Sequence, residues 1–122
     1  MQNLQTGKIG EEMAAAYLEA AGYRILERNY RCPFGEIDII AQEGDTLVFV
    51  EVKSRRSENY GLPQLAVGPE KQRRISKISL FYLQSHRLEP SDVRFDVVAI
   101  LLRPKNPSIE LIKDAFELAY GR

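Results

Sequence analysis

Hydrophobic and polar positions alternate along two neighbouring segments of the chain, residues 35–40 and 48–53. An alternation of this kind predicts two β-strands that each have one buried face. Gly44 and Asp45 lie between the segments and suit a two-residue turn, because glycine at the first central position favours type II′. The pattern therefore predicts an antiparallel hairpin.

The predicted turn determines which side chains meet across this hairpin. Asp38 comes to lie opposite Glu51, and Glu36 opposite Lys53. Opposed Cβ atoms in such a pair are about 4.5–5.5 Å apart, so two opposed carboxylates repel each other unless a cation lies between them. One face of the hairpin is predicted to be apolar core: Ile37, Ile39, Val48, Val50 and Val52. The other face changes from apolar residues near the turn (Ile40, Leu47 and Phe49) to a group of charges at the open end.

The rest of the pattern predicts an α/β fold, with a mixed central sheet flanked by helices, in one domain over residues 1–122. An apolar stripe predicts a helix over residues 7–21, capped by Gln5 or Thr6, and a second helix begins near Pro69. Further strands are expected at 23–31, 93–102 and 108–113, with a short helix or tail at 114–120. The predicted order is αβββαβ, with a further strand after it.

Facing carboxylates on the hairpin are hard oxygen ligands of the kind that Mg²⁺ or Mn²⁺ prefers. A zinc site would need paired Cys and His ligands, but the chain has one cysteine, Cys32, and one histidine, His86. The alternative is a solvated strand face with one Glu–Lys pair. The apolar residues that share this face argue against it.

Four motifs follow one another along the chain: Gly7-x-x-Gly10-Glu11, Gly35-Glu36-Ile37-Asp38, Phe49-Val50-Glu51-Val52-Lys53-x-Arg55, and Arg94-Phe95-Asp96-Val97-Val98. The set resembles the PD-(D/E)XK signature of restriction enzymes and Holliday-junction resolvases. It closely resembles the YraN-like family of small bacterial proteins, generally described as uncharacterised and nuclease-like. One departure is Ile37, since proline often precedes the aspartate in the broader signature.

This resemblance implies a restriction-endonuclease-like core and a catalytic set of Asp38, Glu51, Lys53 and Glu11. Asp38, Glu51 and Glu11, with the Val52 carbonyl, would hold Mg²⁺ or Mn²⁺. For Glu11 the alternative stays open that it is a favourable acid in the first turn of a helix. The function expected is metal-dependent, endonuclease-like phosphodiester hydrolysis on DNA, branched DNA included. The alternatives are a catalytically silent nuclease-fold protein that binds nucleic acid or a protein, and a hydrolase of nucleotides.

The net charge is zero, but basic residues concentrate between Lys53 and Lys77. Those expected to contact nucleic-acid phosphates are Arg55, Arg56, Lys71, Arg74 and Lys77. The first two begin a polar loop over residues 54–63, and the others recur on one side of the second helix. A solvated helix face is the alternative. Asp96 is expected to pair with a nearby arginine.

The sequence also leads to expectations about the location and the partners of the protein. The expectation is a cytoplasmic protein with no membrane partner, because no apolar run is long enough to span a bilayer and the lone cysteine fits a reducing compartment. A weak homodimer is also expected, since twofold dimers are the commonest oligomers. Its surface would combine the strands at 93–102 and 108–113 with Phe116 and Tyr120.

Overall fold

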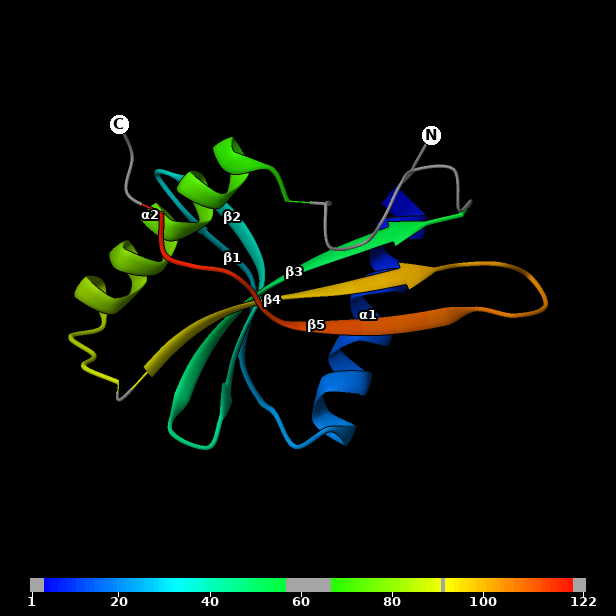
Figure 1. Cartoon of the computed structure of the whole chain (residues 1–122), viewed down its shortest axis with the longest axis horizontal. Coiled ribbons are helices and arrows are strands. Elements are labelled where there is room, and N and C mark those ends of the chain that lie inside the picture. The colour runs from blue at the N-terminus through cyan, green and yellow to red at the C-terminus, as the bar shows by residue number, and fades with distance from the viewer. Residues whose placement is uncertain (1–3, 57–66, 91, 120–122) are drawn as a thin grey trace.

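The computed structural model describes residues 4–56, 67–90 and 92–119, in which two helices flank one five-stranded sheet (Figure 1). The elements in chain order are α1 (Leu4–Ala20), β1 (Arg24–Cys32), β2 (Gly35–Glu43), β3 (Thr46–Arg55), α2 (Pro69–Ser85), β4 (Asp92–Leu101) and β5 (Ser108–Phe116). No helix in these ranges is long and apolar enough to cross a membrane.

The strands lie side by side in sequence order, from β1 at one edge to β5 at the other. β3 and β4 are parallel and the other neighbours are antiparallel. A parallel pair needs a long crossover connection, and here that connection contains α2. The prediction of an α/β fold with a mixed central sheet and the order αβββαβ is confirmed, and β5 is the additional strand.

The helices cover opposite faces of the sheet. Ala14 and Leu18 of α1 pack in one buried cluster with Val48 and Val50 of β3. The other cluster contains Phe49 of β3, whose side chain lies on the α2 face, and its members from α2 are Ile75, Ile78 and Tyr82. Alternate residues of β3 therefore belong to two separate cores.

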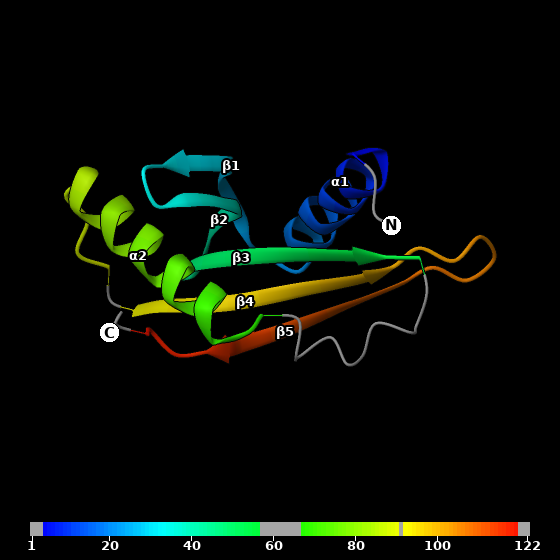
Figure 2. The same cartoon turned by 90° about the horizontal axis from the view of Figure 1, so that it is seen from above.

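The β2–β3 hairpin has the predicted register near its turn but opens sooner than expected. Gly44 in the turn has a φ of 60°, which glycine adopts without strain. Pairs run from Glu43 and Thr46 up to Ile39 and Val50 and end there. β2 stays paired with β1 beyond that point, so these two strands leave the layer formed by β3, β4 and β5 (Figures 1 and 2).

This divergence corrects the predicted positions of Ile37 and Glu36. Ile37 does not share the apolar face of Ile39, because it belongs to the core cluster on the α2 side. Glu36 does not lie opposite Lys53, because it is paired with Arg31 on β1, with Arg31 Nη2 3.6 Å from Glu36 Oε1. The prediction for Ile37 assumed regular alternation along β2. The prediction for Glu36 assumed that β2 and β3 stay paired to the end of the hairpin.

α1 begins at Leu4, three residues earlier than predicted, so Gln5 and Thr6 lie within the helix and not before it. Its buried side contains Ala14, Ala15 and Leu18. Ile9 and Tyr17, although apolar, are 41% and 38% exposed. The small side chains of Ala14 and Ala15 let α1 lie close to β3. The size of the side chains therefore helps to decide which side of the helix is buried, in addition to their hydrophobicity.

Gly10 is the closest of these approaches, and Gly10→Ala should destabilise the protein. A Cβ on Gly10 would lie 1.6 Å from Ser54 Oγ and 2.9 Å from Ser54 Cβ. Overpacking of this kind costs about 1–3 kcal/mol. Gly7→Ala on the same helix is the control, because a Cβ there meets nothing within 4 Å. Urea unfolding of both variants checks the prediction, and equal stabilities would contradict it.

A buried polar network joins β4 to β2, to β5 and to the connection between α1 and β1. Asp96 is 1% exposed and accepts hydrogen bonds from Tyr23 Oη at 2.8 Å, Arg94 Nε at 2.9 Å and the Asp114 N–H at 3.0 Å. Arg94 also donates to Glu43 at 2.7 Å. The predicted pairing of Asp96 with an arginine is confirmed, and the network has a structural role.

The C-terminal region continues β5 to Phe116, and residues 117–119 form no helix. β5, which belongs to the expected dimer surface, forms an edge of the sheet. Tyr120 lies outside the described residues, as does most of the predicted loop at 54–63. Dimer formation stays a prediction.

Candidate functional site

Asp38 lies at the point where β2 leaves β3. Its Oδ2 accepts a hydrogen bond of 2.7 Å from the Val52 N–H, so the carboxylate takes a donor of β3 just beyond the last paired residues. Burial, followed by repulsion from the Glu51 carboxylate, raises the pKa of Asp38 to about 7. The predicted direct pairing of Asp38 with Glu51 does not form, because β2 and β3 pair only as far as Ile39 and Val50, but the two carboxylates still influence each other.

Glu51 is the most deeply buried charge of the group, with a side chain 7% exposed. Its Oε2 is in contact with Lys71 Nζ and lies 3.8 Å from Lys53 Nζ. Two ammonium groups therefore share one buried carboxylate oxygen. Burying the Glu51 carboxylate without a positively charged partner would be strongly unfavourable.

The two lysines influence each other. Burial, followed by the hydrogen bond and charge of Lys71, lowers the pKa of Lys53. Burial also acts to lower the pKa of Lys71, but attraction and hydrogen bonding to Glu51 outweigh it and the pKa is raised. Lys71 is therefore the closer partner of Glu51, and Lys53 lies farther from the same oxygen.

The position of Lys71 corrects the prediction that it lies with Arg74 and Lys77 on an outward basic side of α2. Lys71 precedes the buried residues Ile75 and Ile78 by four and seven positions, so helix periodicity places it in line with the core. This spacing is the feature of the sequence that could have placed Lys71 on the buried side of α2. Arg74 and Lys77 are exposed as expected.

Arg55 and Arg56 lie where β3 ends. Arg55 is the last residue of the strand, in register with Leu101 of β4, and Arg56 is exposed. The expected polar loop therefore begins after Arg55, two residues later than predicted. Their contact with nucleic acid stays a prediction.

Glu11 approaches the site from α1 but is engaged elsewhere. With its amide nitrogen turned toward them, Asn29 donates to Glu11 Oε1 at 3.0 Å and to Glu36 Oε2 at 3.2 Å. Asn29 has a φ of 54°, a conformation that asparagine tolerates better than most residues. Asn29 was not among the predicted site residues, because the sequence shows it only as a polar residue on an edge strand.

The structure does not assemble the three-carboxylate ligand set that the family resemblance implies. Among the residues that are described, no three or more His, Cys, Asp or Glu side chains form a group arranged to hold a metal ion. Glu11 still affects the site, because its charge contributes to the raised pKa of Asp38. Val52 meets Asp38 through its N–H, and the role of its carbonyl stays a prediction.

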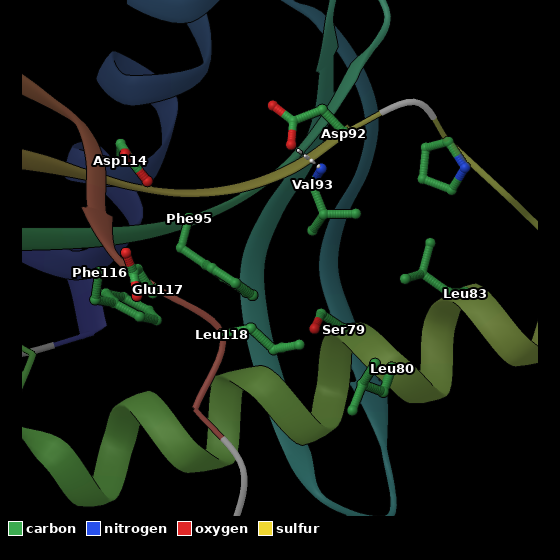
Figure 3. A pocket seen from close by; sticks show the side chains of 11 residues that line it. Ser79, Leu80, Leu83, Asp92, Val93, Phe95, Asp114, Phe116, Glu117 and Leu118 are labelled. Atoms are coloured by element: carbon green, nitrogen blue, oxygen red, sulfur yellow. Dashed lines mark hydrogen bonds between the residues drawn. The ribbon is translucent and has the colours of Figure 1, made fainter.

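A hollow lies elsewhere, between α2 and the strands β4 and β5 (Figure 3). Phe95, Phe116 and Leu118 line it, and Asp92 at its rim accepts the Val93 N–H at 3.0 Å. It shares no residue with the group around Glu51. The candidate site is therefore the charged group at the divergence of β2 and β3.

Comparison with known proteins gives the family. The chain belongs to the uncharacterised protein family UPF0102, whose model matches residues 10–100, and the resemblance to the YraN-like family is confirmed. It is 78% identical over 121 residues to a UPF0102 protein of Syntrophus aciditrophicus, covering 99% of this chain and 95% of the relative. It is 57% identical over 115 residues to one of Geobacter sulfurreducens, covering 93% and 90%.

Among solved structures, the chain is similar to Archaeoglobus fulgidus Hjc, a Holliday junction resolvase from an archaeal hyperthermophile. The TM-score is 0.48 with 20% sequence identity, over 84% of this chain and 72% of the resolvase. A second similarity is to Pyrococcus furiosus SfsA in complex with Ca²⁺, with a TM-score of 0.42 and 14% identity over 89% and 62%.

Proposed function

We propose that this protein is a metal-dependent endonuclease that hydrolyses phosphodiesters in DNA, branched DNA included. The observation that carries the proposal is the convergence of Asp38, Glu51 and Lys53 where β2 leaves β3. Two carboxylates and a lysine brought together at partly buried positions are costly for stability alone. They are the groups that phosphodiester hydrolysis uses.

The chemistry of the donors fits Mg²⁺ or Mn²⁺. Asp38 and Glu51 offer hard carboxylate oxygens from neighbouring strands, and Mg²⁺ is usually bound by one or two carboxylates together with waters and substrate phosphate. The lone histidine, His86, lies elsewhere, with Nε2 3.7 Å from Glu27. A nitrogen- and sulfur-rich set for zinc is therefore missing from the described site.

A bound cation would supply charge stabilisation to the phosphoryl group and lower the pKa of an attacking water. The protein residues have separate tasks. Asp38 and Glu51 hold the cation, and Lys53 orients the water or stabilises the negative charge that develops on the phosphoryl oxygens. The hydrogen bond from the Val52 N–H fixes the Asp38 carboxylate while leaving its other oxygen available.

Arg74 and Lys77 are proposed to contact phosphates beside the site, so the double variant Arg74→Ala/Lys77→Ala should bind DNA more weakly and with a shallower salt dependence. Each phosphate that the protein no longer neutralises removes about 0.9 from the slope of log affinity against log salt. Fluorescence anisotropy at several salt concentrations measures this slope. Lys105→Ala, in the exposed β4–β5 connection, is the control, and an unchanged slope in the double variant would show that α2 does not contact DNA.

A catalytically silent protein that binds nucleic acid is the second candidate. The observation in its favour is that Lys53 and Lys71 already balance the charges of Asp38 and Glu51 without a metal ion. In that case these four charged side chains would bind a phosphate of the nucleic acid without cleaving it.

The experiment that separates the two candidates is incubation of the purified protein with duplex, single-stranded and branched DNA, in Mn²⁺ or in EDTA. The endonuclease proposal expects cleavage in Mn²⁺ that is absent in EDTA. The same preparation of Glu51→Gln controls for contaminating nucleases. Binding without cleavage on every DNA would support the silent candidate and contradict the endonuclease.

A further inference from the structure

Lys71 stands in the first turn of α2, and its ammonium contacts a carboxylate that belongs to β3. α2 begins at Pro69, so Lys71 extends from the end of the helix toward Glu51 Oε2. The Lys71 side chain is 26% exposed, compared with 7% for Glu51. The ion pair therefore lies at the boundary between the core and the solvent.

A carboxylate buried as deeply as that of Glu51 is costly without a cationic partner. Lys71 is the partner in contact, and Lys53 is farther away at 3.8 Å from the same oxygen. A divalent cation held by Glu51 would bring a second positive charge to the carboxylate that Lys71 contacts. Lys71 and the metal ion therefore compete for the same carboxylate.

A lysine is suited to giving up such a position. Its ammonium is a compact charge on a flexible four-carbon stem, so it can move while the helix stays in place. Once it leaves Glu51, it needs another anion nearby. The phosphate that arrives with a divalent cation and a nucleic acid is the anion that the proposed reaction brings to this position.

We propose that Lys71 is a second lysine of the site, which holds Glu51 until a divalent cation displaces it and then pairs with a phosphate of the nucleic acid. The second half of this statement rests on the proposed function. The first half concerns only the protein and the cation.

The test of the first half is titration of Lys71→Met with Mn²⁺ by calorimetry, without DNA. Removing the competitor should tighten Mn²⁺ binding about tenfold, as expected for a competing pair worth about 1.4 kcal/mol. Lys105→Met, the same substitution at an exposed residue, should bind Mn²⁺ as the wild type does. If Lys71→Met does not fold, Lys71→Gln serves, because its amide can still donate to Glu51 without the charge. Equal or weaker Mn²⁺ affinity in the folded variant would overturn the inference.

The test of the second half uses DNA binding in a Lys53→Met background, in which cleavage is not expected. Adding Lys71→Met should lower the salt slope of DNA binding by about one unit in Mn²⁺ and leave it unchanged in EDTA. An unchanged slope in Mn²⁺ would overturn the pairing with phosphate. Failure of the wild type to cleave DNA would instead contradict the proposed function, and the calorimetric result would still decide whether Lys71 competes with the cation.

Discussion

Lys53→Met should reduce DNA cleavage in Mn²⁺ by about 10²–10³-fold without weakening the binding of Mn²⁺. Losing one group that stabilises charge in the transition state has an effect of this size. Lys53 is no metal ligand, and its ammonium lies 3.8 Å from Glu51, so its removal leaves both carboxylates in place. Single-turnover cleavage measures the first quantity and calorimetry the second.

Lys105→Met is the matched control for this experiment and should cleave at the rate of the wild type. Lys53→Arg separates charge from geometry, because guanidinium keeps the charge but differs in shape from ammonium. Cleavage by Lys53→Met at the wild-type rate would show that Lys53 takes no part in the reaction. Loss of Mn²⁺ binding together with cleavage would assign it to the structure of the site.

Arg94→Met should lower the free energy of unfolding by about 3–5 kcal/mol, the usual cost of removing one partner of a buried ion pair. Asp96 would keep its hydrogen bonds from Tyr23 and Asp114 but lose its cationic partner while remaining 1% exposed. Glu43 would also lose one donor, although Lys113 Nζ remains 2.9 Å from its Oε2. Guanidinium unfolding monitored by circular dichroism measures the loss.

The same substitution at Arg28 provides the comparison. Arg28 Nη1 lies 2.6 Å from Glu12 Oε1, but the two side chains are 36% and 60% exposed. Exposed pairs of this kind contribute about 0–1 kcal/mol. Similar losses in Arg28→Met and Arg94→Met would mean that burial of Asp96 does not control stability.

The hairpin shows what local sequence can predict. The turn at Gly44 and Asp45 and the alternation of the flanking strands are local features, and they gave the correct pairing up to Ile39 and Val50. The separation of the strands beyond this pair depends on how β2 packs against β1 and α2. No local pattern contains that information, so the predicted positions of Ile37 and Glu36 and the predicted pairing of Asp38 with Glu51 were wrong.

The candidate site shows the same division. The hairpin brings Asp38 to the side of β3, where it accepts the Val52 N–H, whereas the contact of Lys71 with Glu51 joins segments that are far apart in the sequence. Lys71 was grouped with Arg74 by charge, although its spacing from Ile75 and Ile78 indicated the buried side of α2. Glu11 was assigned by family resemblance. Its pairing with Asn29 depends on the positive φ that Asn29 adopts within β1.

The central claim is that the carboxylates at the divergence of β2 and β3 bind a divalent cation. Calorimetric titration of Mn²⁺ into wild type, Asp38→Asn and Asp45→Asn tests it most directly. Asp45 is an exposed turn residue, so Asp45→Asn is a control with the same chemical change. The wild type and Asp45→Asn should bind Mn²⁺ alike, and Asp38→Asn should show no binding. Equal Mn²⁺ affinity in the wild type and Asp38→Asn would contradict the claim.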